Sequence, residues 1–259
     1  MLVLLPPSEG KTGATRGAPL DPGALSLPAL APARERVLDE LTALCGGDPA
    51  KARQVLGLSE GLGGEVARNA ALRTAPARPA GQLYTGVLYD ALGPASLSAA
   101  ARRRARESLL IFSGLWGAVR ITDRIPAYRC SAGVRLPGLG PLAGFWKEPL
   151  AEALPAAAGA GPVLDLRSSA YAAMWRPAGD LARRTVTVRV LQARVVDGVE
   201  KRSVVSHFNK ATKGRVVRAL LEAGPLPRTP AKLAGAVRDL GYVVEEGAAG
   251  RLDIVVTEL

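Results

Sequence analysis

Residues 203–221 read SVVSHFNKATKGRVVRALL, where a short apolar run gives way to a polar segment and then to a helical pattern. The pattern predicts the end of a buried strand at Val204 and Val205, followed by a turn and a helix. The first N–H groups of a helix lack partners within it, and the helix dipole adds positive charge there. The stretch therefore predicts an anion site, although an ordinary helix with a solvated basic face would read the same way. Its cations are Lys210, Lys213, Arg215 and Arg218.

The composition indicates a globular, basic protein. The chain has 259 residues, of which 48% are hydrophobic, so it can bury a real core as one large or two small domains. Lys and Arg number 34 against 23 Asp and Glu, a net charge of +11. Proteins this basic usually meet nucleic acid, nucleotides or an anionic surface. The alternative is a basic scaffold whose charge reflects only the coding bias of its genome.

Cysteine and histidine usage argues against a metal centre. Cys45 and Cys130 are far apart in the sequence, and His207 is the only histidine. This pattern is not that of a zinc site, and free cysteines suit a reducing compartment. No apolar run reaches 18 residues, and the N-terminus lacks a basic segment followed by a long apolar one. We therefore expect a cytoplasmic monomer with no bound metal, no cofactor and no membrane contact.

Short apolar strands recur, and several of them end in polar loops. Strands are predicted at residues 2–5, 108–112, 163–166 and 185–196. α/β proteins place ligands beyond the carboxyl ends of such strands. The prediction is one compact mixed α/β domain over residues 1–259, a mixed sheet flanked by helices, with the loops lining one basic cleft. These loops carry Ser8, Glu9 and Lys11, the segment 113–129, the segment 167–171 with Ser168 and Tyr171, and the segment 206–213.

The segment 113–129 interleaves aromatic and charged residues. Trp116 and Tyr128 could stack on a base while Arg120 and Arg129 hold phosphate. The alternative places both aromatic side chains in the core and pairs Asp123 with a neighbouring arginine. We favour the site interpretation because three types of polar residue occur in one loop.

Two further stretches suit contact with phosphate. Residues 56–72 read as a helix, a glycine-containing hairpin and a second helix, the pattern of a helix-hairpin-helix element at about 50–72 whose amides hold a DNA phosphate. Most such pairs are packing units only. Residues 102–106 contain four arginines, either a solvated helix surface or a face that tracks phosphates.

The order and spacing of the motifs resemble the YaaA family of bacterial peroxide-stress proteins. The resemblance covers nearly the whole chain and rests on LPPSEGKT at 5–12, LYTG at 83–86, SGLWGAVR at 113–120, DLRSSAY at 165–171 and SHFNKATKG at 206–214. It implies one compact α/β domain with a positively charged cleft. It also implies binding of double-stranded DNA with a helix-hairpin-helix-like element, and a role in limiting peroxide damage by lowering free iron.

Two hypotheses remain open. In the first, the chain binds double-stranded DNA without reading its sequence, through phosphate contacts of Lys11, Arg120, Arg129, Lys210, Lys213 and Arg215. In the second, it is an enzyme that acts on a nucleotide or nucleoside, with Glu9, Asp123 or Ser168 doing the chemistry. Either ligand would be lined by Ser8, Tyr84, Trp116, Tyr128, Tyr171 and His207.

Overall fold

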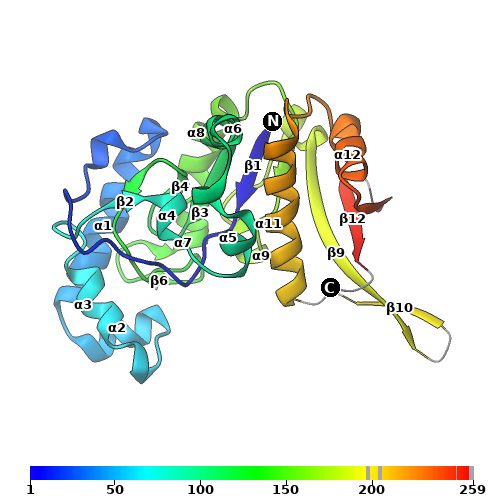
Figure 1. Cartoon of the computed structure of the whole chain (residues 1–259). Coiled ribbons are helices and arrows are strands. Elements are labelled where there is room, and N and C mark those ends of the chain that lie inside the picture. The colour runs from blue at the N-terminus through cyan, green and yellow to red at the C-terminus, as the bar shows by residue number, and fades with distance from the viewer. Residues whose placement is uncertain (197–198, 204–205, 249, 257–259) are drawn as a thin grey trace.

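The computed structural model describes residues 1–196, 199–203, 206–248 and 250–256. An eight-stranded sheet forms the centre of the described chain (Figure 1). The spatial order is β11 (Val243–Glu246), β12 (Arg251–Val256), β9 (Thr185–Val196), β8 (Val163–Asp165), β1 (Leu2–Leu5), β3 (Leu109–Ser113) and β4 (Gly117–Arg120), with β10 (Val199–Ser203) paired to β9. The strands from β12 to β3 run parallel, whereas β11, β4 and β10 pair antiparallel with their neighbours.

The interior strand β1 lies between β8 and β3 and pairs in parallel with both. Leu4 lies opposite Leu110 of β3 and Asp165 of β8, so these three strands end at the same edge of the sheet. All four residues of β1 are buried, as expected for a parallel strand covered by helices on both faces. The loops that follow β1, β3 and β8 therefore start side by side.

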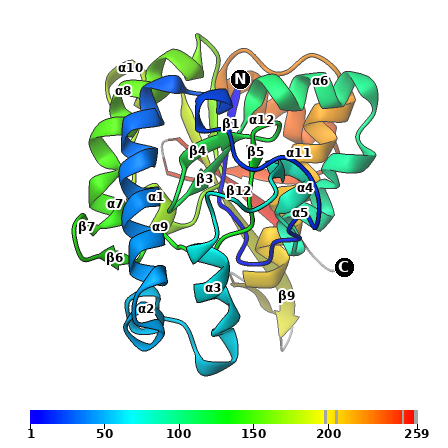
Figure 2. The ribbon, with the colours of Figure 1, turned by 90° about the vertical axis from the view of Figure 1, so that its left-hand side faces the viewer.

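Helices cover both faces of the sheet. Figures 1 and 2 show α5, α6, α11 and α12 on one face and α7 and α8 on the other, with α1 at the β4 side. The helices are α1 (Ala31–Gly46), α2 (Pro49–Leu56), α3 (Gly64–Ala70), α4 (Ala80–Leu83), α5 (Val87–Leu92), α6 (Ala99–Ser108), α7 (Leu142–Phe145), α8 (Lys147–Ala158), α9 (Ser169–Ala172), α10 (Gly179–Arg183), α11 (Ser206–Ala223) and α12 (Pro230–Asp239).

Short elements complete the chain. The 3-10 helices are η1 (Pro22–Ala24), η2 (Pro28–Leu30), η3 (Glu60–Leu62) and η4 (Pro94–Ser96). Two small antiparallel sheets pair β2 (Arg78–Pro79) with β5 (Arg124–Ile125) and β6 (Arg135–Leu136) with β7 (Gly140–Pro141).

Close packing holds α11 against α5. A Cβ atom built on Gly214 of α11 would overlap the carbonyl oxygen of Leu88 and would lie 2.9 Å from the Cβ of Ala91. Only a glycine lets the two helix backbones approach this closely. The contact fixes where the first turns of α11 meet the edge at which β1 ends.

The predicted mixed α/β fold is confirmed. The strands predicted at 2–5 and 185–196 are β1 and β9, and those at 108–112 and 163–166 are found within one residue as β3 and β8. The predicted strand end at Val204 and Val205 lies outside the described residues, and the helix predicted after it is α11. Within the described ranges, no helix has both the length and the apolar composition needed to cross a membrane.

Candidate functional site

The loop after β1 carries Lys11 to a cluster of aromatic side chains. Lys11 and Tyr84 form an isolated β-bridge, which fixes the backbone of the loop. The Nζ of Lys11 donates a hydrogen bond to the carbonyl oxygen of Ser8 at 2.8 Å. The same atom lies 4.5 Å from the centroid of the Tyr128 ring. The ammonium group therefore lies over the electron-rich face of an aromatic ring, a contact that offsets part of its loss of hydration.

Burial changes the acidity of Lys11. It lowers the pKa of the amine to about 8, with Glu9 opposing the shift and Arg129 adding to it. Removing a cation from water disfavours its charged form, which explains the direction. An amine with this pKa can accept as well as donate a proton near neutral pH.

This pKa predicts a specific pH dependence of stability. The folded-state pKa of about 8 lies below the ordinary lysine pKa of 10.5, so between these values the unfolded chain binds more protons than the folded one. Stability should therefore rise with pH from about 8, by up to about 1.4 kcal/mol per pH unit. We expect Lys11→Met to lose this rise between pH 8 and 9.5, measured by urea unfolding. Parallel curves for the two proteins would contradict the prediction.

A chain of hydroxyl groups runs inward from Tyr84. The Tyr84 and Tyr128 hydroxyl oxygens are 2.8 Å apart, and the Tyr128 oxygen is 2.6 Å from Ser113 Oγ. Ser113 Oγ already accepts hydrogen bonds from the backbone N–H groups of Leu115 and Trp116. Its own proton must then go to Tyr128, whose proton goes to Tyr84. In this arrangement the hydroxyl proton of Tyr84 is available for a further hydrogen bond near Lys11.

An ion pair links the β1 loop to Arg129, whose backbone is held by α3. Glu9 Oε2 lies 3.1 Å from Nε of Arg129. The side-chain amide of Asn69, in α3, accepts from the Arg129 N–H at 2.9 Å and donates to its carbonyl oxygen at 2.8 Å. Asn69 is fully buried. Because both bonds use backbone groups, Asn69 fixes the loop whatever contacts the arginine side chain makes.

A second charged cluster lies at the end of β8. Arg167 holds Asp165 with two bonds, from Nε at 2.9 Å and from Nη2 at 2.6 Å. Its Nη1 donates to the Trp175 carbonyl oxygen at 2.9 Å, and its guanidinium lies 4.3 Å from the centroid of the Phe112 ring. Both charged side chains are buried. Hydrogen bonds to Asp165 and Trp175 therefore hold the Arg167 side chain in one position in the protein interior.

Tyr171 couples the two clusters electrostatically, and Lys213 lies beside the cluster at the end of β8. Burial raises the pKa of Tyr171, and the charge of Glu9 raises it further, so the β8 loop lies within electrostatic reach of the β1 loop. Lys213 of α11 donates to the Leu166 carbonyl oxygen at 3.4 Å. Burial lowers the pKa of Lys213, against the attraction of Asp165. We call the group formed by Ser8, Glu9, Lys11, Tyr84, Tyr128, Arg129, Tyr171 and Lys213 the β1-edge site.

Known proteins are similar to this chain along its full length. Residues 1–248 match the family described as "Peroxide stress protein YaaA". The chain belongs to the YaaA family. A UPF0246 protein of Streptomyces coelicolor is 64% identical, with all of both chains covered. A UPF0246 protein of Corynebacterium efficiens is 42% identical over 99% of this chain and all of the relative, and one of Corynebacterium glutamicum is 41% identical over 95% of each.

In this YaaA chain, the β1-edge site unites many of the residues selected from the sequence. The loop after β1 contributes Ser8, Glu9 and Lys11, and Tyr84 reaches it through the bridge. The remaining members come from three other segments and are Tyr128, Arg129, Tyr171 and Lys213.

Other selected residues lie elsewhere. Arg120 and Asp123 are at the opposite edge of the sheet, because β4 runs antiparallel to β3 and carries them back. There Asp123 accepts from Ser26 Oγ at 2.7 Å and from the Arg120 N–H at 2.9 Å, so it holds a turn. Trp116 is fully buried behind Tyr128. Arg215 lies near Tyr242, whose pKa is raised by burial against the opposing charge of Arg215.

Three selected residues lie at the margins. Ser168 is exposed and precedes α9, and Lys210 is exposed in the first turns of α11. The side chain of His207 lies outside what the structure describes. Across the described part of the chain, no group of three or more His, Cys, Asp and Glu side chains is placed to hold a metal ion.

Sequence reasoning placed Arg167 in a polar loop after a strand, but it missed Asn69 and the buried pair that Arg167 forms with Asp165. Asp165 and Arg167 are two residues apart at a strand end, and that spacing could have indicated a pair. Asn69 has no such signal, because its partner Arg129 is 60 residues away in the chain.

Proposed function

We propose that this YaaA protein is a peroxide-stress protein that binds double-stranded DNA without sequence preference. The DNA would lie across the β1-edge site and the region of α2, η3 and α3. Protection from damage driven by free iron would then act through this binding and not through iron storage.

The double hydrogen bond between Asn69 and Arg129 supports this proposal most directly. It fastens α3 to the loop that carries the Glu9–Arg129 ion pair. Figure 1 shows α2 and α3 extending past the same edge of the sheet at which β1 ends. A Cβ atom built on Gly61 or Gly64 would have no neighbour within 4 Å, so the backbone there is open to a phosphate group.

The exposed cation Lys210 is the contact to test. Lys11 and Lys213 are half-buried, whereas Lys210 is exposed at the start of α11. Each phosphate contact contributes about 0.9 to the slope of log K against log salt concentration. We expect Lys210→Ala to weaken binding of unrelated duplexes equally and to reduce this slope by about one, measured by fluorescence anisotropy.

Lys232→Ala is the matched control. Lys232 is an exposed lysine on α12, and its removal changes the net charge by the same amount. We expect its slope to equal that of the wild type. Absence of wild-type binding at low salt would overturn the proposed function. Equal slopes for all three proteins would show that Lys210 does not contact the DNA.

A second function is favoured by the environment of Lys11. A lysine with a pKa of about 8, beside Glu9 and the Tyr84 hydroxyl, suits proton transfer better than simple phosphate contact. The candidate is an enzyme that acts on a nucleotide or nucleoside, with Glu9, Lys11 or the exposed Ser168 at the reacting atoms. Turnover of such a compound by the wild type, abolished in Glu9→Gln, would establish it.

A further inference from the structure

A separate pocket of about 230 Å³ lies beside the turn that follows β4. This turn is at the end of the sheet opposite to the β1-edge site. Its apolar lining includes Pro79, Pro94 and Ile121. Gln82 of α4 and Thr122 of the turn after β4 add polar groups. None of these residues belongs to the β1-edge site, so the pocket needs its own explanation.

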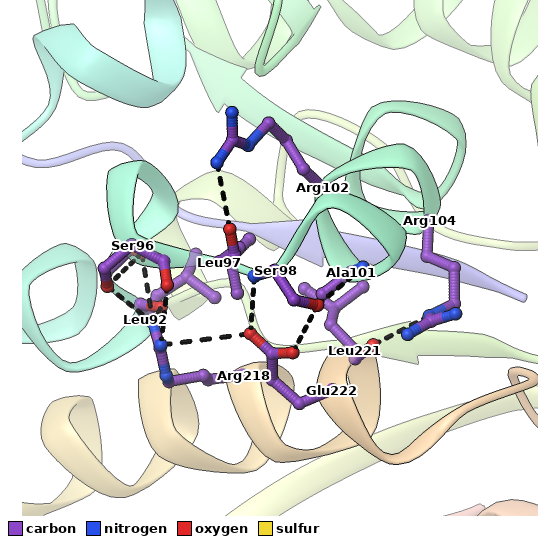
Figure 3. A network of polar contacts seen from close by, with 11 residues as sticks. Leu92, Ser96, Leu97, Ser98, Ala101, Arg102, Arg104, Arg218, Leu221 and Glu222 are labelled. Carbon is purple, nitrogen blue, oxygen red and sulfur yellow. Dashed lines mark hydrogen bonds and ion pairs between the residues drawn. The ribbon is translucent and has the colours of Figure 1, made fainter.

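Two arginines of α6 complete the lining. Arg102 and Arg106 are four residues apart, which places them on the same side of the helix. Figure 3 shows Arg104 directed toward Leu221 of α11, whereas Arg102 extends away from α11 and donates to the Leu97 carbonyl oxygen. The two bonds of Glu222 to Ser98 anchor the start of α6. The helix is thus fixed on one side, and Arg102 and Arg106 line the pocket.

The charges of these two arginines are not neutralised. No carboxylate lines the pocket among the described residues. The nearby Asp123 is occupied by Ser26 and the Arg120 N–H. In the described part of the chain, Arg106 has no ion pair and no hydrogen bond, and Arg102 uses only its bond to Leu97. Like charges at this spacing destabilise a helix, and a bound anion would remove that repulsion.

We propose that this pocket binds a phosphomonoester with a small apolar body. Guanidinium groups present planar pairs of N–H donors that match phosphate oxygens, and two of them can hold one dianion. The prolines and Ile121 then cover the body of the ligand, and Gln82 and Thr122 can hydrogen-bond its remaining oxygens. The proposal does not rest on DNA binding, because the pocket lies at the other edge of the sheet.

Isothermal titration calorimetry at low salt measures the affinity of the pocket for phenyl phosphate, ribose 5-phosphate and inorganic phosphate. We expect phenyl phosphate to bind most tightly. Arg106→Ala should weaken it about tenfold or more, since a hydrogen bond to a charged group is lost. Ala95→Trp should abolish binding by filling the pocket without a change of charge. Arg103→Ala, an exposed arginine of the same helix that does not line the pocket, should bind like the wild type.

Equal losses in Arg103→Ala and Arg106→Ala, or no binding of any probe, would overturn the site. If inorganic phosphate bound as tightly as phenyl phosphate, the proposed preference for a ligand with an apolar body would be overturned, and free phosphate would be the ligand. Tighter binding of ribose 5-phosphate would overturn it in favour of a polar body. Both arginines are exposed, so their removal leaves the core intact, and Ala95→Trp is checked by its melting temperature.

Discussion

Replacing Arg167 with methionine is expected to lower the free energy of unfolding by about 3–5 kcal/mol. The guanidinium makes two hydrogen bonds to Asp165 and lies against the Phe112 ring in a buried setting. Methionine fills part of the volume but leaves the Asp165 carboxylate buried without its partner. Removal of one partner is costly because the buried carboxylate loses two charged hydrogen bonds that water cannot replace, and the charge of Lys213 compensates only in part. Urea unfolding monitored by circular dichroism measures the change.

Two further variants show whether the uncompensated charge is the cause. In Asp165→Leu/Arg167→Met no charge remains, so most of the stability should return. Arg183→Met breaks an ion pair with Asp180 in which both side chains are about three-quarters exposed, and it should leave stability almost unchanged. A double variant as unstable as Arg167→Met would show that packing of the guanidinium, and not its charge, is what matters.

Gly214→Ala is expected to destabilise the protein by about 2–3 kcal/mol. The added methyl group would overlap the Leu88 carbonyl oxygen and press on Ala91, so α11 must move away from α5. The shift would also displace Lys213, its neighbour in the β1-edge site. Unfolding curves in urea measure the loss.

The matched control is Gly235→Ala in α12. Gly235 is also within a helix, but a Cβ atom there would have no neighbour within 4 Å. Alanine should therefore stabilise the protein by about 0.5–1 kcal/mol, because it restricts the unfolded chain and favours the helix. Equal effects of the two substitutions would contradict the close approach of α11 and α5.

The sequence was most informative where local chemistry decides the outcome. The apolar run at 2–5, stopped by Pro6 and Pro7, could be assigned as a buried strand because parallel strands covered on both faces are apolar throughout. Ser8, Glu9 and Lys11 were then predicted at a ligand-binding edge by the general behaviour of α/β sheets.

Strand direction limited the prediction for the segment 113–129. Its residues are adjacent in sequence, and they were expected to converge on one loop. The antiparallel return of β4 instead separates Ser113 and Tyr128 at one edge from Arg120 and Asp123 at the other. Periodicity reveals a strand, but only pairing with its neighbour reveals which way it runs.

The amino-acid sequence by itself determined the family, the mixed α/β class and the residue types available at the strand ends. These follow from short-range patterns, which the chain carries whatever its final packing. Only the tertiary structure decided that Asn69 holds Arg129, that Lys11 is buried enough to have a pKa of about 8, and that α11 meets α5 at a glycine. Each of these depends on groups far apart in the sequence, whose distance and exclusion from water arise only when the chain folds.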